Sequence, residues 1–283
     1  MNNSIRKILV ALDLSETSLH ALETAVALAK KRSATLFILN VKEPRFGMHK
    51  DDNELPITHD YSTSGDVLSA LVGSVEHSHE MKPYLLQKEG IAFDCILSTA
   101  VEEDIDLIVM GSNGASGTRN GYTGTNTYTV MKHAECPVLS VPPKNKVLHF
   151  NKVVFPIRPV SGALMRYDVL SHFISPNATI DVLGLSYRRM ERETNVLEKI
   201  VNEIRDRAEA DRIRVRTFWS NGETVAEDVL NFTNQNMPDL VVLTNILDVT
   251  TKQGFIGPHT QTIVNNAKVP VLCIKGVSVA SFA

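Results

Sequence analysis

A glycine-rich segment in the first half of the chain holds the residues best suited to chemistry. Five glycines fall between Gly111 and Gly124, directly after the apolar run Asp106–Met110. Glycine permits positive φ and has no Cβ, so the N–H groups of such a loop can wrap an anion closely. Thr125 and Thr127 follow where a helix is predicted to begin, and its unpaired N–H groups and positive dipole end would face the same anion. The pattern therefore predicts a phosphate-binding site.

Strands and helices alternate around that loop. Lys7–Leu12 is apolar throughout, as expected for a strand covered on both faces. Ser15 is a candidate N-cap for the helix that follows. The apolar residues of that helix recur at helical spacing, at Leu19, Leu22, Val26 and Ala29. This alternation predicts right-handed βαβ units and a parallel sheet whose carboxyl edge, where the glycine segment lies, is the usual ligand crevice.

The two halves of the chain repeat each other. Asp106–Met110 aligns with Asp239–Leu243, and Cys136–Val141 aligns with Val269–Ile274, at one shared offset of 133 residues. Two further pairs of strand-like segments recur in the same order, Lys7–Asp13 with Lys152–Arg158 and Thr35–Val41 with Thr179–Leu185. The sequence therefore predicts an α/β protein of two tandem Rossmann-like domains, at residues 1–143 and 150–276, each a mostly parallel five-stranded sheet with helices on both faces.

The halves differ ahead of one helix. Arg212–Gly222 has the pattern of a strand and turn, whereas Gly90–Ile91 runs almost directly into the helix around Cys95. We therefore expect about one strand to be missing from the first half. The polar segment Met48–Asp66 is expected to be a mobile loop. The longer segment Arg45–Glu89 contains a candidate metal cluster of His49, His59, His77 and His79. His77 and His79 are two residues apart and face away from each other on a helix, so we expect no metal site.

The amino-acid composition bears on which partners the protein could bind. The 283 residues are 43% hydrophobic and 22% charged, with a net charge of −3, which gives no electrostatic reason to expect nucleic acid or an anionic membrane. No apolar run approaches the roughly 18 residues of a membrane helix, and no secretory signal precedes the first strand, so we expect a cytoplasmic protein. The three cysteines, at Cys95, Cys136 and Cys273, form no CxxC pair and are expected to be buried thiols.

The spacing Gly111-x2-Gly114-x9-Gly124-Thr125 resembles the G-x2-G-x9-G-[S/T] signature of the ATP-binding branch of the universal stress protein family. The resemblance covers the opening and closing strands of the first half and, with less specificity, the second half. It implies an adenine nucleotide alpha hydrolase-like fold that binds ATP or ADP, with or without Mg²⁺. A glycine segment by itself is more often a plain surface loop, but strand, helix and spacing together favour binding.

The resemblance assigns the nucleoside end of that site. Asp13 would contact the adenosine part of the ligand or a phosphate-bound metal. Ala11 and Val41 would line the adenine pocket, and Met110 and Gly111 would border the ribose. Asp13 alone would be weak evidence, because an aspartate after a strand is commonly a turn or helix cap.

The resemblance also assigns the phosphate end. Gly114 would approach the phosphates, and Gly124, Thr125, Asn126 and Thr127 would bind the phosphate tail. Asn126 departs from the family pattern, which often has a small aliphatic residue there.

The second half lacks this signature. Its equivalents of the four signature residues are Thr244, Leu247, Gly257 and Pro258, and Arg158 replaces Asp13. Leu247 would place a side chain where close backbone approach is needed, and Pro258 removes an N–H from a helix start. We therefore expect no ATP in the second half, where Arg158 could bind another anion, form a salt bridge or be solvated.

By resemblance, the chain would be a stress-response protein that binds ATP or ADP in its first domain and acts as a nucleotide-dependent regulator of a protein partner. No nucleophile and base arrangement is present, so we expect at most slow ATP hydrolysis. The final strands of the halves, Val138–Val141 and Val271–Ile274, would pair within the chain, and further homodimerisation stays open. Two alternatives are a nucleotide-independent scaffold of the same fold, which the missing strand would favour, and a nucleotidyl transferase or ligase.

Overall fold

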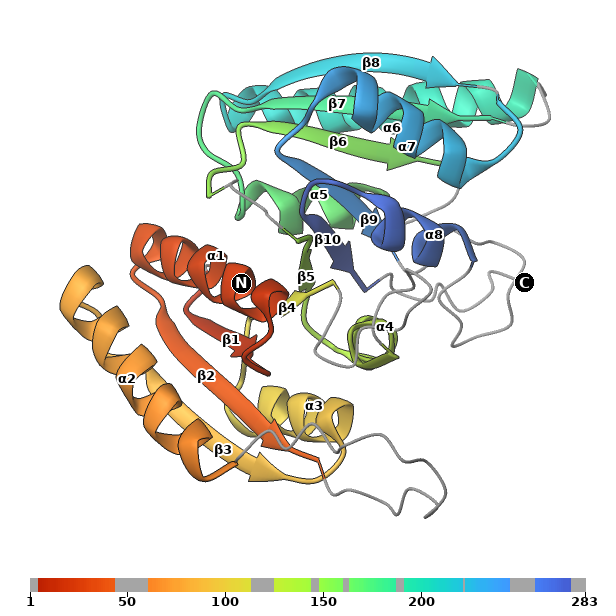
Figure 1. Cartoon of the computed structure of the whole chain (residues 1–283). Helices are drawn as coiled ribbons and strands as arrows, with labels where there is room; N and C mark the ends of the chain where they lie inside the picture. The colour runs from red at the N-terminus through yellow and green to blue at the C-terminus, as the bar shows by residue number, and fades with distance from the viewer. Residues whose placement is uncertain are drawn as a thin grey trace, which may run out of the picture.

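The computed structural model describes residues 5–43, 61–112, 125–143, 148–159, 163–186, 191–220, 222–244 and 258–275. The described residues of the first half form nine elements in alternation (Figure 1), namely β1 (Lys7–Ala11), α1 (Glu16–Arg32), β2 (Thr35–Lys42), α2 (Tyr61–His79), β3 (Tyr84–Glu89), α3 (Ala92–Glu102), β4 (Leu107–Gly111), α4 (Thr125–His133) and β5 (Val138–Val141). The second half contains β6 (Lys152–Ile157), α5 (Ala163–Ser171), β7 (Thr179–Leu185), α6 (Glu191–Ala210), β8 (Arg214–Ser220), α7 (Val225–Asn236), β9 (Leu240–Thr244), α8 (Pro258–Asn266) and β10 (Val271–Ile274). None of these described helices is long and apolar enough to cross a membrane.

The ten strands of the described residues form one sheet, in the order β3-β2-β1-β4-β5-β10-β9-β6-β7-β8. Each half contributes five strands that pair in parallel, as the sequence predicts, and the halves meet at the antiparallel pair β5 and β10. The two predicted sheets are therefore joined edge to edge into a single one.

The junction of the halves is symmetric. Leu139 of β5 pairs with Leu272 of β10, and these two residues are separated by the 133-residue offset of the repeat. On either side, Val138 pairs with Cys273 and Ser140 with Val271. The pairing is thus symmetric about Leu139 and Leu272, so that the equivalent positions of the two repeats exchange partners. This is the pattern of a two-fold interface between identical subunits. The expected pairing of the final strands is confirmed.

The predicted loss of a strand before Cys95 is wrong. β3 pairs with β2 over six residues, from Tyr84 opposite Phe37 to Glu89 opposite Lys42. It was hard to recognise because it is an edge strand with a polar end, and only two residues separate it from α3. The first half therefore has a complete sheet.

The expected loop at Met48–Asp66 falls partly outside the described residues, and its last six residues begin α2. His49 and His59 also lie outside the described residues, and His77 and His79 end α2. The described part of the chain contains no cluster of metal-ligating side chains.

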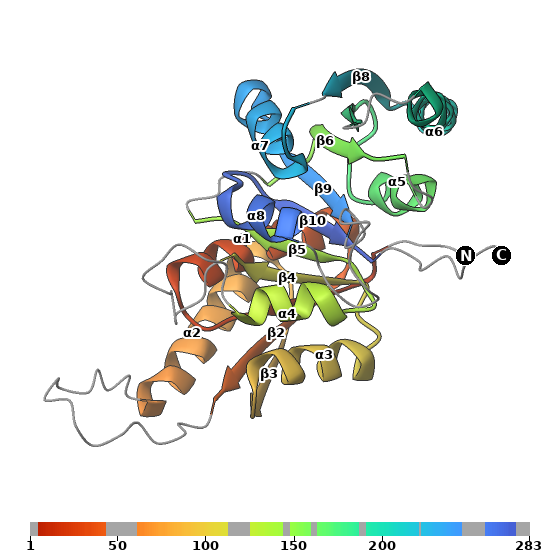
Figure 2. The same cartoon turned by 90° about the vertical axis from the view of Figure 1, so that its right-hand side faces the viewer.

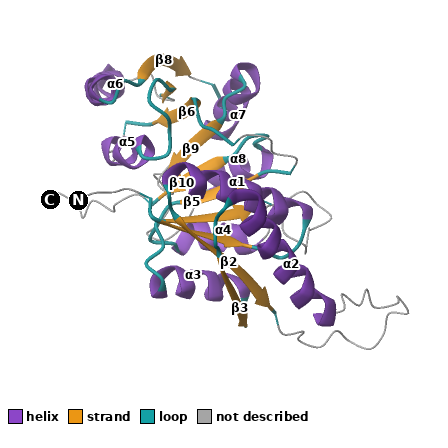
Figure 3. Cartoon of the chain, turned by 90° about the vertical axis from the view of Figure 1, so that its left-hand side faces the viewer, coloured by secondary structure: helices purple, strands orange, loops and turns teal. Residues whose placement is uncertain are grey.

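Helices cover both faces of the sheet, as Figures 2 and 3 show from opposite sides. One buried cluster gathers residues of α1, α2, α5 and α6, and a second gathers residues of α3, α4, α7 and α8. The first cluster continues across the junction of the halves. There Lys31 Nζ at the end of α1 donates to Ser175 Oγ at 2.6 Å, and Arg32 Nη2 donates to the Ile174 carbonyl at 3.1 Å.

The repeat extends to individual hydrogen bonds. Asp106 Oδ2 accepts from the backbone N–H groups of Arg6 and Lys7 at 2.8 and 2.9 Å. Its equivalent Asp239 accepts from Asn151 and Lys152, both at 2.9 Å. In each half, an aspartate just before one central strand therefore fixes the start of its neighbour.

Candidate functional site

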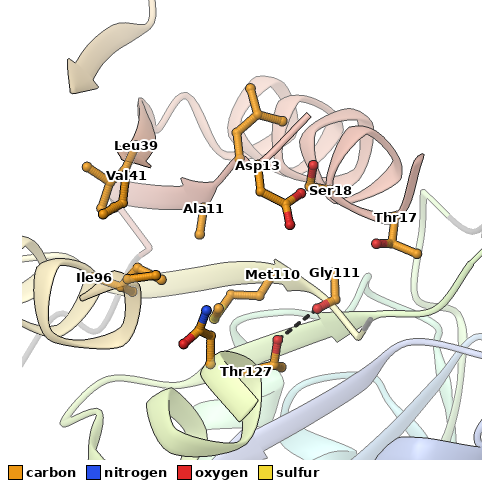
Figure 4. Close-up of a pocket in the computed structure, with 13 residues that line it drawn as sticks. Ala11, Asp13, Thr17, Ser18, Leu39, Val41, Ile96, Met110, Gly111 and Thr127 are labelled. Carbon is orange, nitrogen blue, oxygen red and sulfur yellow. Dashed lines mark hydrogen bonds between the residues drawn. The ribbon is translucent and has the colours of Figure 1, made fainter. Parts of the chain in front are cut away.

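A pocket lies at the carboxyl ends of β1 and β4, which are adjacent parallel strands. The chain leaves β1 toward β2 on one side and continues from β4 toward β5 on the other, so this edge is the topological switch point of the first half. The pocket has a volume of about 590 Å³ including its mouth. It is lined by Ala11, Leu12, Asp13, Thr17, Ser18, Leu39, Val41, Ala92, Ile96, Met110, Gly111, Asn126 and Thr127 (Figure 4).

The pocket has an apolar end and a polar end. Figure 4 shows Leu39, Val41 and Ile96 together at one end, with Asp13 and Thr17 at the other. Strands β1, β2 and β4 supply the apolar walls because their carboxyl ends reach the same edge, and the first turns of α3 complete them. A ligand with a flat apolar ring and a charged tail matches this division.

Asp13 has a structural role as well as a place in the pocket. Its Oδ1 accepts from the Ser15 backbone N–H at 3.0 Å and from Ser15 Oγ at 2.5 Å. Ser15 is the N-cap of α1, as the sequence predicts, and its Oγ accepts from the Ser18 N–H at 3.2 Å. Asp13 therefore orients the start of α1, whose first turn also lines the pocket through Thr17 and Ser18.

The start of α4 is tied to the end of β4. Thr127 is buried, and its hydroxyl donates to the Gly111 carbonyl at 2.9 Å. A Cβ at Gly111 would lie 2.9 Å from the carbonyl carbon of Thr17, so glycine is required there by the close packing of α1 on β4. The first turns of α1 and α4 thus both border the pocket, and both present the positive end of a helix dipole.

Seven of the ten predicted site residues line this pocket, namely Ala11, Asp13, Val41, Met110, Gly111, Asn126 and Thr127. Thr125 is the first residue of α4, beside them in the chain, whereas Gly114 and Gly124 lie outside the described residues. Sequence reasoning missed Leu12, Thr17, Ser18, Leu39, Ala92 and Ile96. Thr17 and Ser18 could have been found from the Ser15 cap, but nothing local marks the α3 residues.

The equivalent edge of the second half has a different charge. Arg158 follows β6 where Asp13 follows β1, and α8 begins at Pro258, which has no N–H to offer an anion. Arg166 of α5 is buried nearby, donates to the Pro156 carbonyl at 3.4 Å and packs 5.5 Å from the centre of the Phe155 ring. Burial lowers the pKa of Arg166 to about 10.

The thiols are less uniform than expected. Cys273 is buried in β10, whereas Cys95 and Cys136 are partly exposed, so the prediction of three buried thiols is wrong for two of them. Burial of the sulfur still raises the pKa of Cys136 to about 11.

A sequence model described as the Universal stress protein family matches residues 4–142. The universal stress protein YxiE of Bacillus subtilis is 30% identical over 152 residues, which cover 97% of that protein and 48% of this chain. The chain belongs to the universal stress protein family. A second member, from Methanocaldococcus jannaschii, is 28% identical over 141 residues, covering 83% of that protein and 49% of this chain.

The universal stress protein fold extends over the whole chain. The crystal structure of a universal stress protein from Archaeoglobus fulgidus superposes with a TM-score of 0.71, covering 97% of this chain and 98% of that one at 15% identity. At this identity the likeness concerns the fold alone, and it supports the tandem arrangement.

Proposed function

We propose that this universal stress protein binds ATP or ADP in the pocket of its first half and acts as a nucleotide-dependent regulator in a stress response. The observation that carries the proposal is one pocket, at the switch point of the sheet, that joins an apolar end to the N-terminal turns of two helices. The apolar end would hold the adenine ring, and the helix ends would hold the phosphates.

The side chains fit a nucleotide bound with Mg²⁺. Asp13 is the one acidic side chain among the described residues that line the pocket. Magnesium is usually held by one or two carboxylates together with substrate phosphates and water. Asp13 would therefore supply the protein ligand, and the metal would neutralise phosphate charge. Thr127 would act differently from the initial expectation, because its hydroxyl proton is already donated to the Gly111 carbonyl. Its contribution would be to hold the start of α4 against the pocket.

The second half would not bind nucleotide in this way. Arg158 and Pro258 change the charge and the hydrogen-bonding capacity of the corresponding edge. The scaffold alternative loses its main support, because the strand that was expected to be missing is present as β3.

Calorimetric titration of Mg-ATP and ADP tests the proposal. The variants are Gly114→Leu, which copies Leu247 of the second half into the first, and Leu247→Gly as the reverse change in the half expected not to bind. We expect one site per chain, abolished by Gly114→Leu and unchanged by Leu247→Gly. The proposal fails if the intact protein binds neither nucleotide, or if Gly114→Leu leaves binding unchanged.

A further inference from the structure

The two outer strands of the ten-stranded sheet differ in charge. β3 lies at one end of the sheet and β8 at the other, so each has one backbone edge that pairs with no described strand. Within β3, Lys88 and Glu89 balance each other, and both are ion-paired, with Glu102 at 2.7 Å and Lys42 at 3.3 Å. Within β8 there are two arginines, Arg214 and Arg216, and no acidic residue. Arg216 is ion-paired with Asp181 of β7, so Arg214 supplies the net positive charge of this edge.

β8 is a regular strand and not a shortened or interrupted edge. All seven of its residues pair in parallel with β7, from Arg214 opposite Thr179 to Ser220 opposite Leu185. It contains no proline, and its neighbours α6 and α7 lie on its two faces, with no described helix or strand along its outer side in Figure 2. A long regular edge of this kind is a template for one more strand.

Alternation gives β8 two chemically distinct faces. Arg214 and Arg216 point to the face of α7, where the Arg216 guanidinium lies 5.5 Å from the ring centre of Phe218. Val215, Thr217 and Trp219 point to the opposite face, where Val215 packs against the cluster that contains α6. Arg214 is exposed, and the Arg216 side chain is 45% exposed although two of its nitrogens hold the carboxylate of Asp181 at 2.6 Å.

Trp219 gives the opposite face an exposed aromatic surface. Its ring lies across Gly184 of β7, so closely that a Cβ there would be 2.4 Å from the ring. The residue nevertheless remains 50% exposed. A strand added beside β8 would place side chains against this ring, since cross-strand neighbours lie about 5 Å apart.

From these features we propose that the β8 edge binds an extended segment of a partner protein in which acidic and apolar residues alternate. Backbone hydrogen bonds to the open edge would provide the affinity common to strand addition. Carboxylates at alternate positions would lie beside Arg214 and Arg216, and the apolar residues between them would lie beside Val215 and Trp219. The neutral edge of β3 has no such preference.

The chain supplies its own probe, because Trp219 is its single tryptophan. We would titrate the full chain with the blocked peptide Glu-Val-Glu-Val-Glu-Val-Glu and follow tryptophan emission. We expect a saturable shift to shorter wavelength as the peptide covers the ring. A peptide of the same composition in scrambled order, and one with proline for each valine, should give no shift, because they lose the two-faced pattern or the backbone donors.

Two charge reversals locate the binding site. Arg214→Glu changes an exposed residue of β8 and should weaken peptide binding about tenfold, because an attractive cross-strand pair becomes repulsive. Lys30→Glu makes the same charge change at an exposed position in the first half and should leave binding unchanged.

Three results would overturn the proposal. The first is no saturable change in emission with the alternating peptide. The second is equal binding of the proline peptide, which would show charge attraction without strand pairing. The third is equal binding by Arg214→Glu, which would place the peptide elsewhere on the chain.

Discussion

Replacing Thr127 with valine isolates the hydrogen bond that ties α4 to β4. Valine has nearly the same shape, so the change removes the 2.9 Å bond to the Gly111 carbonyl without leaving a cavity. Loss of such a bond costs about 1 kcal/mol net, and up to about 3 kcal/mol when a buried group is left unsatisfied. Thr127 is only 3% exposed, so we expect a loss of about 2 kcal/mol in the free energy of unfolding, measured by urea denaturation.

The Thr127→Val change should also weaken nucleotide binding. The largest effect on ATP affinity arises if the full free energy of the lost hydrogen bond, about 2 kcal/mol, must be supplied again when α4 is positioned for binding. This cost corresponds to a roughly 30-fold weaker affinity, because 1.4 kcal/mol is tenfold. This is an upper bound, measured by calorimetry. Thr127→Ser is the matched control, since it keeps the hydroxyl and loses a buried methyl group worth about 1 kcal/mol of stability. We expect it to bind ATP nearly as the unchanged protein does. Equal affinities of the valine variant and the unchanged protein would refute the tethering role of Thr127.

Two further predictions concern packing and pH. Gly184→Ala should push the Trp219 ring off the strand, lowering the unfolding free energy by about 1–2 kcal/mol and shifting tryptophan emission to longer wavelength, and an unchanged emission would contradict the contact. Burial raises the pKa of Cys136 from its ordinary value of 9.0 to about 11, so unfolded chains ionise first. The stability that this thiol contributes is complete below pH 9.0 and is lost as the pH rises through about 11. Between pH 8 and pH 10.5, the free energy of unfolding measured by denaturation should fall less for Cys136→Ser than for the unchanged chain. Equal decreases would show that ionisation of Cys136 does not contribute to the loss of stability.

Much of the fold could be predicted because its signals are local or repeated. The Ser15 cap and the stripe of α1 depend on neighbours within one or two turns of helix. The sequence alone does not fix which face of α6 is buried. Val196, Ile200, Ile204 and Ala208 recur at helical spacing, but Val196 is 43% exposed, whereas Leu197 and Val201 are buried in the core. Two adjacent apolar stripes satisfy the same periodicity, and only packing against the sheet selects one.

The edge strand β3 shows where local signals end. Its polar residues are typical of a turn or helix. It is a strand because it pairs with β2, which lies far from it in the sequence. The opposite edge shows the same principle. The carboxylate of Asp181 is fully buried, and it has Arg216 as its ion-pair partner only because β7 and β8 pair in this register.

The family, the duplication and seven residues of the pocket could be predicted without a structure, because glycine spacing, apolar strands and a fixed offset are properties of the chain order. What lies beside those residues depends on the tertiary structure. It brought Ile96 from α3 and Thr17 from α1 to the pocket, committed the Thr127 hydroxyl to Gly111, and placed Trp219 over Gly184 on an open edge. These contacts join residues far apart in the chain, and only packing of the complete sheet and its helices sets the distances between them.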